Sequence, residues 1–318
     1  MRIFILLIGA VSVLLQQQTA PRIDVPVQKL VANVVGPNGR FVDGLQARDF
    51  IVQENGVQKE IGRFLPDSES PVSIGVLIDT SGSMATSATR SIRGGSRAPS
   101  PRWAAAVGTT RALLHLTKPQ DEFQLMSFNA TMVVTQAFTH DHNKIESHLR
   151  EMGPNGFGTN ISGAVDTALK EMKKAVNRRR GLVVITDVED NEGGGIAALR
   201  RTLHTEEVPV YIFALRPEGQ VFETRPQVGV GAQSRPVDET LKTVSKEGEG
   251  QYLVVDVDRL QGEQTAVKIV EFVTQFAKDV RGQYTISYLS SVTDDRQQDR
   301  AIRVRTVNPD FTVRYRRD

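Results

Sequence analysis

Buried strands and amphipathic helices alternate along the middle of the sequence. The apolar run from Val72 to Ile78 is nearly continuous, which is the pattern of a strand buried on both faces of a parallel sheet. A helical period of apolar residues follows from Trp103 to Thr117, and the same alternation then continues along the chain. Further strands are predicted at 122–128, 131–135, 182–185, 208–215 and 252–255, and further helices at 141–151, 161–172, 196–205, 238–246 and 263–280.

The segments on either side of this unit alternate residue by residue between apolar and polar side chains. Residues 25–64 contain short runs of this kind, with a hairpin signal at Asn55-Gly56. After Gly282 the alternation returns in the stretches 284–288, 302–304 and 313–315. Both flanks therefore predict antiparallel strands. Val27, Val31 and Val35 share the apolar face predicted for the first strand, on which Lys29 and Asn33 are polar exceptions.

Together these patterns predict an α/β fold, with a doubly wound, mostly parallel, Rossmann-like sheet that has helices on both faces. Neither flank is long enough to bury a core of its own, so we expect the two to pair into one small antiparallel β-domain. The α/β domain is then inserted between them or flanked by them. In the alternative, each flank extends an edge of the main sheet. The predicted division is a signal peptide at 1–20, an N-terminal β segment at 21–69, the α/β domain at 70–281, and a C-terminal β segment at 282–318.

The first twenty residues have the pattern of a secretory signal peptide. Arg2 precedes an apolar stretch from Ile3 to Leu15, and a polar exit follows that ends at Ala20. The apolar stretch is shorter than the roughly 20 residues that span a bilayer. We therefore expect a secreted, periplasmic or cell-envelope protein with no membrane span in its mature chain. An uncleaved N-terminal anchor is the alternative.

Composition limits the chemistry that the chain can perform. Its 39 basic and 37 acidic residues give a net charge of +2, too small to favour nucleic acid as a partner. The short basic run Arg178-Arg179-Arg180 is interpreted as a solvated face or a helix end. The chain has no cysteine, which excludes disulfides, zinc–cysteine sites and thiol catalysis.

Oxygen-bearing side chains follow the first buried strand directly. Asp79, Ser81 and Ser83 occupy alternate positions of a short loop, in which Gly82 allows a tight turn. In a doubly wound sheet, ligands bind at the carboxyl ends of the strands, where the strand order reverses. A carboxylate and two hydroxyls are hard oxygen donors of the kind that Mg²⁺ prefers. The same residues alone are also typical of a capped turn before a helix.

Asp79-x-Ser81-x-Ser83 resembles the first element of the metal-ion-dependent adhesion site (MIDAS) of von Willebrand factor A domains. Thr159 is similar to the threonine element of that site, and Asp187 to its second aspartate element. The resemblance implies a divalent ion, Mg²⁺ or else Mn²⁺ or Ca²⁺, held by Asp79, Ser81, Ser83, Thr159 and Asp187. It also implies that an acidic side chain of a protein partner completes the metal shell.

This resemblance covers about residues 72–280. The flanks extend it, because Asp49-Phe50 and the segment up to Gly56 resemble the lead-in of von Willebrand factor A-related proteins of acidobacteria. The segment 284–288 resembles the closing strands of the same group.

Two features depart from the family pattern. Val188 stands where the family usually has glycine, so the loop after Asp187 must take an ordinary backbone shape or carry strain. Glu189 and Asp190 follow at once and are rival carboxylates. The loop between Met84 and Trp103 is also long, and we interpret it as solvated, with a cover over the site as the alternative. Its arginines are Arg90, Arg93, Arg97 and Arg102.

These features predict an extracytoplasmic, metal-dependent protein-binding or adhesion module and not an enzyme. One alternative is a structural module of a cell-envelope assembly, in which the metal only stabilises the fold. The other is a metal-dependent hydrolase, which needs a general base near the metal. His140-Asp141-His142 is interpreted as a surface segment, and the sequence has no Gly-x-Ser-x-Gly, His-Glu-x-x-His or phosphate-loop motif.

Overall fold

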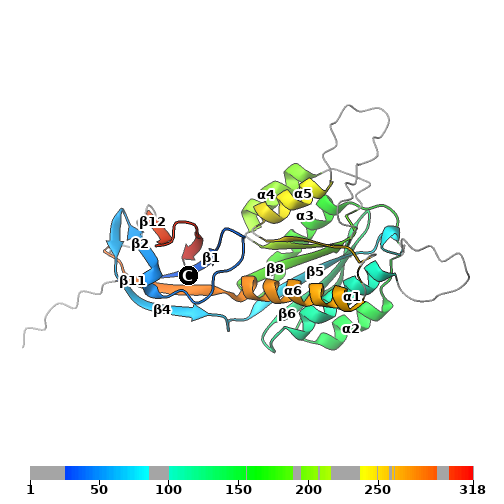
Figure 1. The fold of residues 1–318 in the computed structure, drawn as a ribbon, viewed down its shortest axis with the longest axis horizontal. Coiled ribbons are helices and arrows are strands. Elements are labelled where there is room, and N and C mark those ends of the chain that lie inside the picture. Colours follow the sequence, from blue (N-terminus) through cyan, green and yellow to red (C-terminus); the bar gives the residue numbers. More distant parts are fainter. Residues whose placement is uncertain are drawn as a thin grey trace, which may run out of the picture.

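The computed structural model places two groups of strands side by side, one of them covered by helices (Figure 1). It describes residues 26–85, 100–154, 156–188, 195–206, 208–215, 237–248, 250–257, 260, 262–291 and 301–317. The predicted signal peptide lies outside these residues. In the described part of the chain, no helix has both the length and the apolar character that crossing a membrane requires.

The larger group is a six-stranded sheet with the strand order β10-β9-β8-β5-β6-β7. Neighbouring strands run parallel except β6 and β7, which are antiparallel. From β5 the chain adds β6 and β7 on one side and then returns to add β8 on the other, so the strand order reverses beside β5. The strands are β5 (Val72–Asp79), β6 (Glu122–Phe128), β7 (Met132–Thr139), β8 (Arg179–Thr186), β9 (Val210–Leu215) and β10 (Tyr252–Val255).

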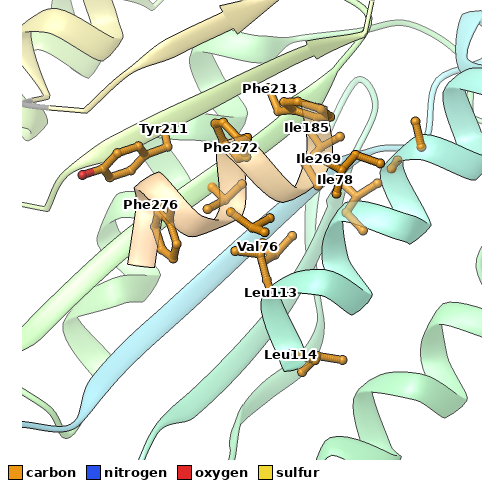
Figure 2. Close-up of a cluster of buried hydrophobic side chains, with 14 of the residues drawn as sticks. Val76, Ile78, Leu113, Leu114, Ile185, Tyr211, Phe213, Ile269, Phe272 and Phe276 are labelled. Carbon is orange, nitrogen blue, oxygen red and sulfur yellow. The ribbon is translucent and has the colours of Figure 1, made fainter. Parts of the chain in front are cut away.

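Helices cover both faces of this sheet, which explains why every residue of β5 is buried (Figure 1). Val76 and Ile78 point into one core, where Phe272 and Phe276 lie over the sheet (Figure 2), whereas Leu77 lies in the core on the opposite face. The first core is covered by α1 (Pro101–His115), α2 (His142–Glu151) and α6 (Gly262–Arg281), and the second by α3 (Ile161–Glu171), α4 (Ile196–Glu206) and α5 (Val237–Glu247). This arrangement confirms the predicted doubly wound α/β fold.

The smaller group consists of antiparallel strands from both flanks of the chain. One sheet has the order β13-β1-β11-β4 and the other the order β12-β2-β3, and a separate apolar core lies between them. In the described residues the flanks pair with each other, and none of their strands joins the six-stranded sheet. The strands are β1 (Val27–Val35), β2 (Phe50–Glu54), β3 (Val57–Lys59), β4 (Ile61–Asp67), β11 (Gln283–Leu289), β12 (Ile302–Thr306) and β13 (Thr312–Arg317).

The turn between β2 and β3 has the predicted geometry. Asn55 and Gly56 both have positive φ, 51° and 82°, as a two-residue hairpin turn requires. Short 3₁₀ turns are the remaining helical elements described, at Ala47–Asp49, Gly82–Ala85 and Met172–Lys174. The division of the chain at residues 69 and 281 stays a prediction.

The buried face of β1 differs from the prediction. Leu30, Ala32 and Val34 are completely buried, whereas Val27 is 63% exposed. Both faces of this strand carry apolar residues, so composition alone could not choose between them, and a choice shifted by one residue reverses every side chain. The face with Asn33 is turned toward the α/β domain, where its amide donates to the Gly282 carbonyl over 2.9 Å.

The basic run at 178–180 is also not simply solvated. Arg179 is the first residue of β8 and is buried. It forms an ion pair of 2.8 Å with Asp67 at the end of β4, and it donates to the carbonyl of Arg281 over 2.7 Å. The interpretation was wrong for Arg179 because the residue lies where the antiparallel strands meet the larger sheet, and a carboxylate compensates its charge there.

A second ion pair lies next to the first, because Arg179 also bonds the carbonyl of Arg281. Arg281 at the end of α6 binds Asp121, which immediately precedes β6 and whose side chain is fully buried. Asp121 also accepts the backbone N–H groups of Val72 and Lys118, over 2.9 and 2.6 Å. We call Asp67–Arg179 and Asp121–Arg281 the seam pairs. They lie at the amino-terminal ends of β5, β6 and β8.

Candidate metal site

The predicted site residues lie at the opposite, carboxyl-terminal ends of these strands. Asp79 ends β5 and Asp187 directly follows β8, and the two strands pair in parallel up to Ile78 and Ile185. Their ends are therefore neighbours, at the position where the strand order reverses. In Figure 1 this edge lies near the start of α1, away from the antiparallel strands.

A third segment, residues 156–160, runs along the Asp79 loop. The Gly82 N–H donates to the Gly156 carbonyl and the Gly156 N–H to the Thr80 carbonyl, each over 2.9 Å. Gly156 is required because a Cβ atom there would lie 2.3 Å from the side chain of Asn129. The two backbone hydrogen bonds of Gly156 hold the segment that contains Thr159 beside the Asp79 loop, just before α3 begins.

The carboxylate of Asp79 is completely buried and held in one orientation. One oxygen accepts the backbone N–H of Ser81 over 2.8 Å, and the other accepts the hydroxyl of Thr186 over 2.7 Å. Burial and the negative charge of Asp187 nevertheless raise the pKa of Asp79 from 3.8 to about 7, against these hydrogen bonds. The two carboxylates therefore lie close enough to repel each other.

Three hydroxyls complete the predicted donor set. The Oγ atoms of Ser81 and Ser83 are 2.9 Å apart, at the start of the 3₁₀ turn after the Asp79 loop. Thr159 is fully buried, and its Oγ1 has no hydrogen-bond partner among the residues that the structure describes. A buried hydroxyl in that state costs about 1 to 3 kcal/mol, so Thr159 is a place where a ligand would stabilise the fold.

Asp187 is paired with an arginine. Its side chain is completely buried, and Oδ2 lies 2.9 Å from a guanidinium nitrogen of Arg102. Arg102 lies in the first turn of α1, behind the N-cap Ser100, whose side chain accepts the N–H of Trp103. The Ser100 hydroxyl also donates to the carbonyl of Met84, which ties the start of α1 to the turn that contains Ser83.

Residues 74–190 match the model of a known protein family, the von Willebrand factor type A domain. Over these residues the chain is similar to a von Willebrand factor type A domain. The matched range begins in β5 and ends beyond Asp187, so it includes all five predicted site residues. Domains of this family typically bind other proteins.

The chain is also similar to several solved structures. An aerotolerance-related membrane protein from Bacteroides fragilis is 21% identical, with a TM-score of 0.45 over 64% of this chain and 98% of that chain. The conserved hypothetical protein BatB from Bacteroides thetaiotaomicron is 20% identical, with a TM-score of 0.46 over 65% and 99%. A von Willebrand factor type A protein from Catenulispora acidiphila is 15% identical, with a TM-score of 0.48 over 76% and 52%. No curated protein matches the sequence.

Val188, which departs from the glycine of the expected pattern, has a backbone conformation that favours glycine. Its φ is 69°, in the left-handed region that a β-branched residue rarely enters. The side chain is buried against the core under α3 and α4, and the N–H donates to the Thr186 hydroxyl over 3.0 Å. Of the two outcomes expected for this loop, the strained one is correct, and such strain costs on the order of 1 to 3 kcal/mol.

The remaining sequence candidates lie elsewhere. Glu189, Asp190 and the arginines 90, 93 and 97 are outside the described residues. His140 bonds the Asp121 carbonyl over 2.7 Å and His142 the Thr117 hydroxyl over 2.8 Å, so both lie toward the seam end of the sheet. Sequence reasoning placed Arg102 in the long loop and missed its contact with Asp187. Ser100-Pro101, a typical helix start, was the available signal that Arg102 belongs to a helix.

Proposed function

We propose that this von Willebrand factor type A domain binds a divalent metal ion and uses it to hold a protein partner outside the cytoplasm. The ion is Mg²⁺, or else Mn²⁺ or Ca²⁺, and its ligands, direct or through water, are Asp79, Ser81, Ser83, Thr159 and Asp187. The observation that carries the proposal is the buried Thr159 hydroxyl without a hydrogen-bond partner, in a segment pinned to the Asp79 loop.

The electrostatics of the donor set support a cation at this edge. In the described part of the chain, the hydrogen-bond donors to Asp79 are neutral groups of Ser81 and Thr186. A divalent ion would oppose the repulsion between Asp79 and Asp187, which contributes to the raised pKa of Asp79. The described residues contain no cluster of three or more His, Cys, Asp or Glu side chains, so a metal here would depend on hydroxyl ligands as well.

The chemistry supplied by the bound ion would be Lewis acidity toward an incoming oxygen ligand. We propose that a carboxylate of the partner supplies that ligand and that an apolar group beside it contacts Phe157. Phe157 is 93% exposed and lies between Gly156, which is pinned to the Asp79 loop, and the Thr159 position. Aromatic side chains, Phe among them, are enriched at the cores of protein interfaces.

The proposal is a binding function and not a catalytic one. His140 and His142, the pair that a hydrolase might use, are bonded to the backbone and to Thr117 at the other end of the sheet. The location outside the cytoplasm rests on the signal-peptide pattern of residues 1–20.

Metal binding is tested by calorimetric titration of the full chain with Mg²⁺ after chelator treatment. We expect Thr159→Val to weaken Mg²⁺ binding at least tenfold without lowering the metal-free stability, because it replaces an unsatisfied hydroxyl with a methyl group. The matched control is Thr109→Val. Thr109 is equally buried, but its hydroxyl donates to the Ala105 carbonyl over 2.8 Å. Absence of Mg²⁺ binding and of any thermal shift, both in the unmodified chain and in Arg102→Gln, which lacks the arginine paired with Asp187, would exclude the metal site.

Partner binding is tested by capture from cell-envelope extracts, with and without chelator. The expected result is capture that is lost in chelator and in Asp79→Ala and reduced in Phe157→Ala. If Mg²⁺ raises the melting temperature but Ser83→Ala captures the same partner equally well, the metal has only a structural role.

A further inference from the structure

We propose that Arg102 competes with the divalent ion for Asp187, so that the site binds metal weakly until a partner's carboxylate arrives. This inference rests on the proposed metal site and concerns its regulation. Arg102 is not among the residues that resemble the family's metal ligands; its role follows from its position in this structure.

The contact between Arg102 and Asp187 is buried and direct. A guanidinium nitrogen lies 2.9 Å from Oδ2, and the two side chains are 9% and 0% exposed. A charge that is removed from water in this way is tolerated only when it is paired. Arg102 therefore already performs at Asp187 the task that a metal ion would perform, which is to neutralise a buried carboxylate.

The position of Arg102 is set by a helix and not by a loop. Ser100 caps α1, Pro101 occupies its first turn, and Trp103 packs into the core under α1 and α6. A cation in the first turn of a helix is unfavourable, because the helix dipole is positive there. Asp187 compensates this cost, because its carboxylate forms a buried ion pair with Arg102.

The charges of the site explain the consequence for metal binding. Asp79 and Asp187 carry two negative charges when ionised, and Arg102 carries one positive charge. A divalent ion added beside Arg102 changes the sum of these three described charges from −1 to +1, and the ion and the guanidinium repel each other in a poorly solvated place. A carboxylate from a partner returns the sum to zero. Metal and partner are therefore expected to bind cooperatively.

The experiment is a calorimetric titration of Mg²⁺ into the full chain and three variants, in the absence of partner. Arg102→Gln removes the charge but keeps hydrogen-bond donors, and we expect it to tighten Mg²⁺ binding at least tenfold. Arg102→Lys keeps the charge and should stay within about threefold of the unmodified chain. Arg111→Gln is the matched control, because Arg111 lies on the same helix in a partly exposed ion pair with Glu146, and it should change nothing.

A second measurement uses acetate as a probe carboxylate and needs no variant. In the unmodified chain, excess acetate should tighten Mg²⁺ binding relative to chloride at equal ionic strength. In Arg102→Gln this acetate effect should shrink. The acetate series keeps the proposal testable even if Arg102→Gln folds poorly without metal.

The outcomes separate this proposal from the one it rests on. If the unmodified chain binds Mg²⁺ but Arg102→Gln binds it equally or more weakly, Arg102 orients Asp187 for the metal and competition is excluded. An acetate effect that is absent in the unmodified chain also overturns the proposal. If neither the unmodified chain nor any variant binds Mg²⁺, the metal site itself fails. Binding that is detectable only in Arg102→Gln supports both proposals.

Discussion

The same strands end in two buried charge clusters of opposite character. At their amino-terminal ends, each seam carboxylate has an arginine of its own, Asp121 with Arg281 and Asp67 with Arg179. At their carboxyl-terminal ends, Asp79 and Asp187 lie side by side, and the arginine of this cluster is bonded to Asp187. The clusters are separated by the length of β5, about 25 Å for eight residues.

The difference appears in the protonation behaviour of the two ends. Burial alone would raise the pKa of Asp121, but the hydrogen bonds from Arg281, Lys118 and Val72 outweigh it, and the pKa lies below its usual value of 3.8. At Asp79, burial and the charge of Asp187 outweigh the hydrogen bonds, and the pKa is raised to about 7. Burial of charge is therefore common to both ends. Incomplete compensation distinguishes the end with the candidate site from the end with the seam pairs.

The largest expected effect is the difference between two Asp→Asn substitutions, one at the seam and one at the candidate site. Asp121→Asn should lower the free energy of unfolding by about 3 to 5 kcal/mol, because it leaves the buried Arg281 without a counter-charge. In chelator, Asp79→Asn should change it by less than about 1 kcal/mol, because the lost hydrogen bond is offset by the relief of repulsion from Asp187. Urea unfolding measures both. Equal losses at the two positions would contradict the comparison.

The next prediction tests the backbone strain at Val188, beside the candidate site. Val184→Gly, within β8, should cost about 3 kcal/mol or more, since it removes a fully buried side chain from a relaxed strand. Val188→Gly also removes a buried side chain but relieves a positive φ, so its net cost should be within about 1 kcal/mol. The two variants are compared by urea unfolding. A similar cost in both would mean that Val188 carries no strain.

The pH dependence of the seam gives a smaller effect. Because the pKa of Asp121 is lowered on folding, its contribution to stability is complete above its unfolded value of 3.8 and is lost as the pH falls through the folded value. The difference in stability between the unmodified chain and Asp121→Asn should therefore shrink on acidification below about pH 4. Unfolding curves at several pH values measure it. A difference that grows on acidification would reverse the sign of the argument.

The smallest expected effect on stability is at Phe157. Because this side chain is almost fully exposed, Phe157→Ala should change the free energy of unfolding by less than about 0.5 kcal/mol. Thermal unfolding is the measurement. A clear destabilisation would show that Phe157 packs within the fold and is not available to a partner.

Much of the fold could be predicted from local patterns. The continuous apolar run of β5 predicted a strand buried on both faces, and Asn55-Gly56 predicted the hairpin turn that the φ values show. The predicted alternation of strands and helices also identified every strand of the six-stranded sheet. The face of β1 was predicted wrongly, because both of its faces are apolar and only the neighbouring strands decide which one meets the core.

The candidate site also has one part that the sequence predicted and another that it could not. Asp79, Ser81 and Ser83 lie within five residues of one another, so a strand end and a tight loop are enough to bring them together, and this much the sequence determined by itself. The tertiary structure decided which distant residues join them. Arg102 and Asp187 are 85 positions apart, and the buried, partnerless hydroxyl of Thr159 exists only because a loop is pinned against β5. Local backbone preferences act over a few residues, whereas burial and charge compensation are properties of the packed chain, and these two properties separate the candidate site from the seam.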